Sequence, residues 1–184
     1  LISGYFKMHE VKFDTAFLRW EAGSVYSQEL VDCPTSSDAK DRKMMTLALH
    51  EAKKSSDWWR QVGAVIVGSN CVIAAAHNKH LPTPHNPYIF GDPRDAIEAG
   101  KDSHLATAVH SEQRAIAEAA KHGISLNGAT LYVSTFPCPM CARLVAASGI
   151  KKLFFHTGHA SLDGQAVLKK AGVIRPPVAT STAA

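Results

Sequence analysis

The chain has 184 residues, of which 46% are hydrophobic, which is enough for one buried core. The formal charge of +4 is mild and no run of five or more Lys and Arg occurs, which argues against a nucleic-acid partner. The sequence contains no run of about 18 apolar residues, so no membrane-spanning helix is predicted. Two of the four Cys stand in one C-x-x-C motif and the other two are single, which does not make a disulfide framework and indicates a reducing compartment. We therefore expect a cytoplasmic protein with no membrane partner.

The two ends of the chain carry the weakest pattern. Residues 1–37 are expected to be an N-terminal extension of unknown role, in which three aromatic residues could form one helix face: Phe13, Phe17 and Trp20. A start at Leu1 rather than Met indicates a processed or partial chain. Residues 176–184, Pro-Pro followed by Ala, Thr and Ser, are expected to be a disordered tail.

Residues 38–55 are predicted to form a helix, because their apolar side chains share one stripe, with acidic residues at the start and lysines at the end. Two apolar runs, 62–67 and 71–76, flank Gly68-Ser69-Asn70 and predict a hairpin. Both runs look buried on two faces, which predicts helices on both sides of a sheet.

Residues 77–103 contain many Pro and Gly and are predicted to be a long loop, with a short helix starting at Asp92-Pro93 and ending at Gly100. Further helices are expected at 110–121, 139–148 and 163–170, and strands at 129–135, 151–155 and 172–174. This order predicts a mixed sheet between helices.

Three residues supply the donor set of a metal site: His110, Cys138 and Cys141. One His and two Cys suffice for a three-ligand Zn²⁺ site, which leaves one tetrahedral position for water and is typical of catalytic zinc. Zinc lowers the pKa of its water to about 7, and Glu112 is the adjacent candidate for carrying the proton. Cys138 and Cys141 share the first turn of one helix, whereas His110 and Glu112 can serve one site only from a helix start. Two helix starts should therefore meet at the metal.

Two other kinds of cysteine site fit this sequence less well. A C-x-x-C at a strand-to-helix turn also fits a thioredoxin-like dithiol, which the upstream His-x-Glu disfavours. A closed zinc ribbon needs a second Cys pair, and Cys33 and Cys71 are single and far apart. Three further histidines lie in or beside the long loop: His80, His85 and His104. We expect them to be ordinary exposed residues, and the alternative is that they bind a second zinc ion.

The combination of His110-Ser111-Glu112 with Pro137-Cys138-Pro139-Met140-Cys141 is similar to the H-x-E…P-C-x-x-C signature of zinc deaminases. Over about residues 40–174 the chain resembles the cytidine/deoxycytidylate deaminase superfamily. The resemblance implies an α/β fold, a three-layer α/β/α sandwich with a mixed central sheet, and a zinc-dependent deaminase domain at 38–175. It also implies that Glu112 is catalytic and that Zn²⁺ is the cofactor.

The long insert between Asn78 and His110, and Phe136 before the Cys motif, are similar to deoxycytidylate deaminases. The expected reaction is hydrolytic deamination of a cytosine nucleotide, dCMP to dUMP plus ammonia. Pro-Cys-Pro-Met-Cys is also similar to guanine deaminases and tRNA editors, so guanine, cytidine, or a base in tRNA or single-stranded DNA are alternatives. A non-enzymatic zinc-bound regulatory module is the outside alternative, against which the intact Glu112 argues.

The resemblance further implies that Asn78 contacts the deoxyribose, that backbone near Ala64 reads the base edge and that Phe136 lines the pyrimidine pocket. A core aromatic fits Phe136 nearly as well. Four residues are candidate partners of the substrate phosphate, although a solvated surface charge is the default for each: Arg60, Lys79, His80 and Arg114. The implied partners are a small-molecule nucleotide, further copies of the chain in a homo-oligomer, and a nucleotide effector.

Overall fold

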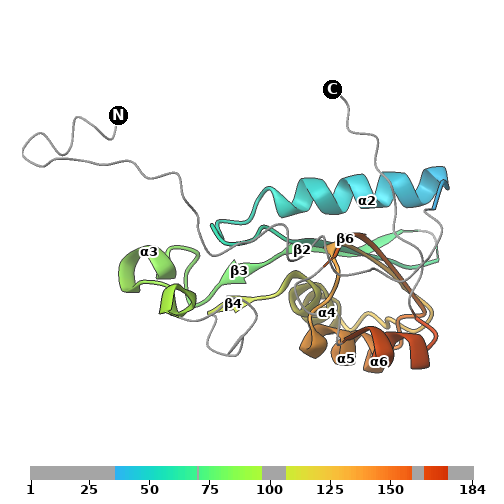
Figure 1. Cartoon of the computed structure of the whole chain (residues 1–184). Coiled ribbons are helices and arrows are strands. Elements are labelled where there is room, and N and C mark those ends of the chain that lie inside the picture. Colours follow the sequence, from blue (N-terminus) through green and yellow to red (C-terminus); the bar gives the residue numbers. More distant parts are fainter. Residues whose placement is uncertain (1–35, 70, 97–106, 159–163, 174–184) are drawn as a thin grey trace, which may run out of the picture.

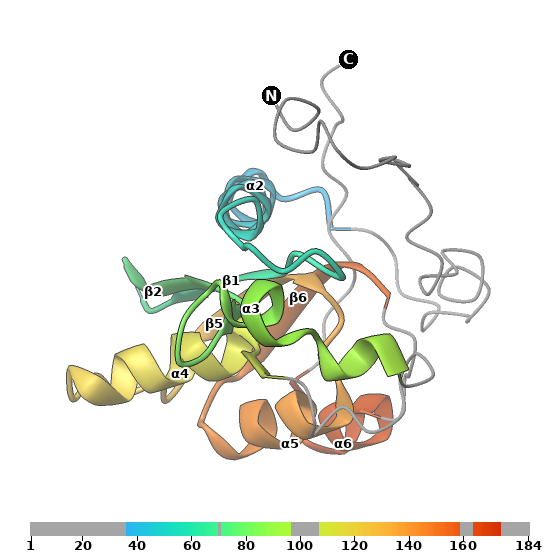
Figure 2. The same ribbon diagram turned by 90° about the vertical axis from the view of Figure 1, so that its left-hand side faces the viewer.

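A computed structural model describes residues 36–69, 71–96, 107–158 and 164–173. These residues form three layers, with helix α2 (Ala39–Ala52) on one face of a central sheet. Three helices cover the other face, as Figures 1 and 2 show: α4 (Ser111–Lys121), α5 (Pro139–Ala147) and α6 (Gly164–Lys170). The predicted α/β/α sandwich is therefore confirmed, whereas the expectations for 1–35 and for the tail lie outside the described residues.

The central sheet has four strands in the order β2-β1-β5-β6. Their bounds are β1 Gly63–Val67, β2 Val72–His77, β5 Thr130–Thr135 and β6 Lys152–Thr157. Strand β1 is antiparallel to both β2 and β5, whereas β5 and β6 are parallel and joined through α5. The sheet is thus mixed, as predicted.

The hairpin prediction is right for the pairing and half right for burial. Every residue of β1 is buried, but in β2 Ala74 and Ala76 are buried while Ala75 between them is exposed. Strand β2 lies at the edge of the sheet and extends beyond the cover of α2 (Figure 2). An apolar run alone does not separate a central strand from an edge strand, and so the expected burial of β2 on two faces was wrong.

Apolar side chains fill both spaces between the sheet and its helices. On the α2 side, Met45 and Ala48 pack on Val65, Tyr132 and Phe154. The other side holds the larger cluster, formed by β1, β5 and β6 with the three remaining helices: Ile66, Leu131, Leu153, Ala115, Ala119, Val145 and Leu168. These two layers of core fix the helices against the sheet.

Helix α2 approaches the start of β1 very closely at Gly63. A Cβ on Gly63 would lie 2.1 Å from the carbonyl oxygen of Ala48 and 2.5 Å from the backbone nitrogen of Ala52. Such distances are far inside contact range, so no larger residue fits here without moving the helix. The side chain of Asp38 caps the other end of α2 by accepting from the N–H groups of Lys40 and Asp41.

The connection from Asn78 to His110 is more ordered than the predicted loop. Strands β3 (Lys79–His80) and β4 (Ala108–Val109) pair antiparallel, and between them stand α3 (Asn86–Phe90) and a 3₁₀ helix at Pro93–Ala96. The short helix expected from Asp92-Pro93 is present as far as Ala96, and residues 97–106 lie outside the described ranges.

The strand expected at 172–174 does not form over Gly172 and Val173, and Ile174 is not described. The carbonyl of Val173 accepts a hydrogen bond from the N–H of Leu153 in β6. In the described part of the chain, no helix is long and apolar enough to cross a membrane.

Candidate active site

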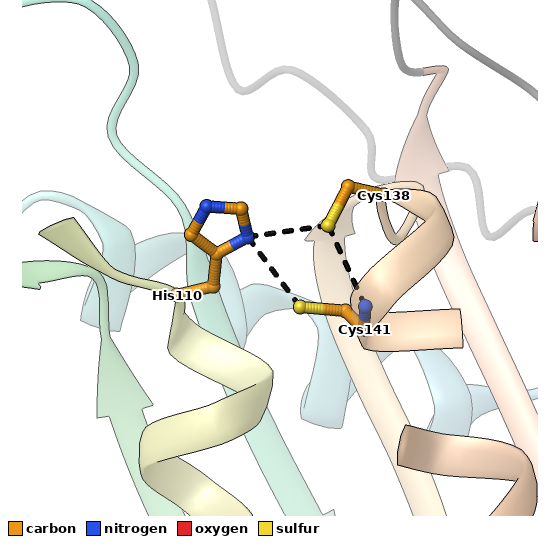
Figure 3. Close-up of side chains that lie close together, drawn as sticks. All are labelled: His110, Cys138 and Cys141. Carbon is orange, nitrogen blue, oxygen red and sulfur yellow. Dashed lines mark hydrogen bonds between the residues drawn. The ribbon is translucent and has the colours of Figure 1, made fainter. Parts of the chain in front are cut away.

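Two helix starts meet on one side of the sheet, and each places a potential metal ligand at its first position. His110 is the N-cap of α4, and its backbone N–H donates to Oε1 of Gln113 at 3.0 Å. Cys138 is the N-cap of α5, which opens with Pro139, a residue suited to the first helical turn. Figure 3 shows both starts facing each other with Cys141 one turn further along. This confirms the predicted convergence of two helix starts.

The three donor atoms have the spacing of a single metal site. His110 Nδ1 lies 3.4 Å from the Sγ of Cys138 and 3.4 Å from the Sγ of Cys141 (Figure 3). A tetrahedral zinc ion with ordinary bond lengths holds its nitrogen and sulfur ligands about 3.5 Å apart. Neither cysteine is in a disulfide, and both are buried. The donor set and its spacing therefore fit zinc.

The pKa values of the three donor residues depend on one another. The pKa of Cys138 is lowered, mainly because the thiol of Cys141 donates a hydrogen bond to its sulfur, and His110 adds to the effect. For the same reason, and through burial, the pKa of Cys141 is raised. The hydrogen bond with Cys138 also raises the pKa of His110. Metal binding displaces protons from ligands of this kind, so affinity for the metal falls as the pH falls.

Glu112 lies in the first turn of α4, beside the three donor residues. Its side chain is buried, and Ser111 Oγ donates to its Oε2 at 3.0 Å. Burial raises the pKa of Glu112, and the neighbouring charge of His110 acts against that rise. The start of a helix favours a carboxylate, so a deeply buried acid is tolerated here. The arrangement brings a proton-carrying group next to a three-ligand cluster.

The side-chain amide of Asn78 is hydrogen-bonded to nearby residues of the chain. Its Oδ1 accepts from the N–H of Val62 at 2.8 Å, and its Nδ2 donates to the Oδ2 of Asp57 at 3.1 Å and to the carbonyl of Arg60 at 2.8 Å. These bonds fix the segment that leads into β1. Contact of Asn78 with a sugar stays a prediction.

The other two residues predicted to contact substrate are both buried. Ala64 lies in β1 opposite Val133 of β5. Phe136 packs edge-on against Phe155 with ring centroids 5.1 Å apart, immediately before the Cys motif. Phe136 is thus a core aromatic two residues before Cys138, and the substrate contacts of both residues stay predictions.

A buried polar network next to the site was not found from the sequence. Arg94 donates to both oxygens of Asp92 and to both oxygens of Asp57, and His80 Nε2 lies 3.4 Å from the Oδ2 of Asp57. His80 is almost fully buried, with Nδ1 2.7 Å from the hydroxyl of Thr107. The default expectation of an exposed loop histidine is therefore wrong for His80, because the β3–β4 pair encloses it. The expectation holds for His85, which is exposed, and His104 lies outside the described residues.

Known proteins share both sequence and fold with this chain. The deoxycytidylate deaminase of Schizosaccharomyces pombe is 34% identical over 137 residues, covering 72% of this chain and 42% of that protein. The deoxycytidylate deaminase of Enterobacteria phage T2 is 53% identical over 109 residues, covering 50% of this chain and 58% of that protein. The chain spans about half the length of the curated relatives it matches first.

Among solved structures, the dCMP deaminase of cyanophage S-TIM5 superposes with a TM-score of 0.60 at 23% identity, covering 77% of this chain and 99% of that chain. At this identity the likeness shows the shared fold. Residues 38–157, which include all four residues of the candidate site, match the family described as the cytidine and deoxycytidylate deaminase zinc-binding region. From this match, the chain belongs to the cytidine and deoxycytidylate deaminase family.

Proposed function

We propose that the chain catalyses the hydrolytic deamination of a cytosine nucleotide, converting dCMP to dUMP and ammonia. The observation that carries this proposal is the buried carboxyl of Glu112 beside the His110, Cys138 and Cys141 cluster. A structural metal site is closed by four protein ligands and gains nothing from a buried acid, whereas a catalytic site keeps one position open for water and needs a proton-carrying group beside it. Relatives that are named as deoxycytidylate deaminases support the choice of substrate.

We assign His110, Cys138 and Cys141 as the ligands of one Zn²⁺ ion. The nitrogen-to-sulfur spacing, the two buried sulfurs and the zinc-binding family support this assignment. When bound, zinc supplies a water molecule that is acidic enough to act as a nucleophile near neutral pH.

Glu112 moves the protons of the reaction. Its carboxylate takes a proton from the attacking water and gives it to N3 of the base. It then takes the proton of the hydroxyl now bonded to C4 and gives it to the amino group, so that the C4–N bond breaks and ammonia leaves. Burial raises the pKa of Glu112, which suits a group that must both take and give a proton near neutral pH. The hydroxyl of Ser111 holds one carboxyl oxygen in place during these transfers.

We assign the contacts with the base and the sugar of the substrate to three residues. Backbone near Ala64 is proposed to read the base edge, Phe136 to line the pyrimidine pocket and Asn78 to contact the deoxyribose. The fixed position of Asn78 between Asp57 and Val62 supports a preformed wall rather than a mobile one. We assign the deaminase domain to residues 38–175, which the family match over 38–157 supports.

We further propose a homo-oligomer that works in the reducing cytoplasm and responds to a nucleotide effector. Three consecutive large apolar side chains on α3 are exposed (Tyr88, Ile89 and Phe90), which supports contact with another subunit. Light scattering on the purified chain should give a mass above the 19.8 kDa of one chain. A mass of one chain at micromolar concentration contradicts the oligomer.

A substrate panel tests the proposed reaction. The purified chain, with zinc measured on the same sample, is assayed on dCMP, dCTP, cytidine, guanine and tRNA. We expect one zinc per chain and the highest kcat/KM on dCMP. A preference for guanine or tRNA contradicts the substrate, and no turnover by zinc-loaded protein contradicts the reaction.

A further inference from the structure

Helix α6 packs against α5, the helix that carries the two cysteines of the candidate site. In Figures 1 and 2, α5 lies between α4 and α6. The start of α6 meets the first turn of α5, in which the N–H of Ala142 donates to the carbonyl of Cys138 at 2.8 Å. The turn that holds both sulfurs is therefore in contact with a helix that supplies none of the four site residues.

Gly164, the first residue of α6, allows a very close approach at this contact. A Cβ on Gly164 would lie 2.6 Å from the Cβ of Ala142 and 3.5 Å from the carbonyl oxygen of Pro137. Carbon atoms in contact are normally about 3.5–4.0 Å apart, so a methyl group here would push α5 and α6 apart by about 1 Å. The Cβ of Ala142 is fixed to the backbone of α5, so no side-chain rotation relieves the contact.

The far ends of both helices are fixed to the rest of the domain. Leu168 of α6 is fully buried, its carbonyl accepts from the N–H of Val173, and the carbonyl of Val173 accepts from Leu153 in β6. Just after the end of α5, the carbonyl of Gly149 accepts from the N–H of Gly128 at 3.0 Å. Neither helix can therefore move away as a whole. The displacement is expected at the two facing starts, next to the cysteines.

The third donor, His110, stands on a helix that is held separately. The guanidinium of Arg114 in α4 donates to the backbone carbonyl of His77 in β2, and Ala115 and Ala119 are buried against the sheet. Movement at the start of α5 would therefore change the two 3.4 Å distances from His110 Nδ1 to the sulfurs. Metal–ligand distances in a well-formed site stay within about 0.2 Å of ideal. A displacement of about 1 Å, even when both helices share it, exceeds that tolerance.

We propose that Gly164 is a positioning residue of the metal site, because its lack of a side chain lets α6 fix the cysteine turn relative to His110. The inference rests on the proposed function, which supplies the metal. It extends the site to a helix that carries no ligand and no proton-carrying group of the reaction. Residues that orient metal ligands from outside typically change metal affinity by about 10- to 100-fold when they are altered.

The test measures metal affinity after the contact is closed and after it is reopened. Wild type, Gly164→Ala, Ala142→Gly, the double variant and Gly68→Ala are titrated with Zn²⁺ against a chelator. Absorption spectra of the same proteins loaded with Co²⁺ report the geometry of the ligands. Gly68→Ala is the matched control, because it adds a methyl group in the hairpin between β1 and β2, away from α5 and α6. Tm shows that each variant is folded.

We expect Gly164→Ala to weaken zinc binding by about 10-fold or more and to change the Co²⁺ spectrum, with Gly68→Ala like wild type. The double variant removes the opposing Cβ and should recover most of the lost affinity. Its Tm should still be lower than that of wild type, because glycine in a helix interior is destabilising. Recovery of affinity without recovery of Tm separates positioning of the ligands from stabilisation of the fold.

Unchanged zinc affinity in folded Gly164→Ala overturns the proposal, and so does a loss of affinity that Ala142→Gly does not restore. If Gly164→Ala does not fold, Ala142→Val crowds the same contact from the other helix and is judged by the same affinities. Wild type that binds zinc but deaminates no cytosine compound contradicts the proposed function alone. Wild type that binds no zinc contradicts both.

Discussion

Arg94 and Asp57 are 37 positions apart and joined by two hydrogen bonds, from Nη1 to Oδ2 at 3.1 Å and from Nη2 to Oδ1 at 3.2 Å. This pair fastens the connection between β3 and β4 to the segment that enters β1. The side chain of Asp57 is 1% exposed and that of Arg94 24%, so water weakens the pair little.

Loss of this pair should destabilise the domain. We expect Asp57→Asn to lower the free energy of unfolding by about 2 kcal/mol, because the hydrogen bonds from Arg94 to Asp57 lose their charged acceptor while Asp92 still pairs with Arg94. Urea unfolding measures the change. The control is Glu118→Gln, which breaks the exposed contact with His122 and should change stability by less than about 0.5 kcal/mol. Equal effects of the two variants would count against the buried pair.

Stability should also fall in acid through Asp92. Burial alone would raise the pKa of Asp92, but hydrogen bonds from the side chain and backbone of Arg94 outweigh it and lower the pKa below the ordinary 3.8. Ionised Asp92 therefore stabilises the fold at pH values above 3.8, and this contribution is lost as the pH falls through the lower folded-state pKa. Urea unfolding between about pH 5 and pH 3 should show a smaller loss for Asp92→Asn than for wild type. Parallel curves would contradict this role.

Glu112→Gln separates proton transfer from metal binding. The variant keeps the shape of the side chain but cannot take a proton, so turnover of dCMP should fall by about 10² to 10⁴-fold while zinc stays bound. Assay and metal analysis are made on one preparation. Glu118→Gln, on the exposed side of the same helix, is the matched control and should retain activity. Full activity of Glu112→Gln rules out its proposed role.

Cys138→Ser should lose the metal. The hydroxyl of Ser is not deprotonated at neutral pH and is a poor ligand for zinc, so zinc content should fall well below one ion per chain. The control is Cys71→Ser, since Cys71 is exposed and lies in the hairpin turn, far along the chain from the site. Metal analysis after dialysis measures both. Stoichiometric zinc in Cys138→Ser would remove Cys138 from the ligand set.

Gly63→Ala should strain the contact between α2 and β1. The added methyl meets the backbone of Ala48 and Ala52, which cannot rotate away, so we expect a loss of about 1–3 kcal/mol in urea unfolding. Gly68→Ala is the control, because its new methyl meets the end of the Ile73 side chain at 3.0 Å, which can shift. An unchanged free energy of unfolding for Gly63→Ala would mean that α2 packs less closely on β1 than described.

The sequence predicted the three donor residues that the structure brings together, because the signals are local. His110 and Glu112 lie two residues apart and Cys138 and Cys141 three apart, so each pair is set by one turn of helix. The three-layer arrangement was predicted from the order of helix and strand patterns along the chain. Boundaries differed by up to three residues, as at the end of α2.

The buried network of Asp57, Asp92 and Arg94 could not be predicted in this way. Its members stand in segments with no periodic pattern, and their pairing depends on how the β3–β4 connection folds back. The same limit hid the burial of His80. A single sequence shows which residues are polar, but it does not show which distant partner offsets the free-energy cost of burying them.

The position of β2 has a consequence for how the protein behaves in concentrated solution. Among the described residues no strand pairs with its outer side, and Val72–Ala76 contains neither a charged side chain nor a proline. Such a rim is a template on which a strand of another molecule can add, and the usual safeguards against this are missing from the strand itself. At high concentration the protein should therefore associate through this rim, which light scattering at increasing concentration measures.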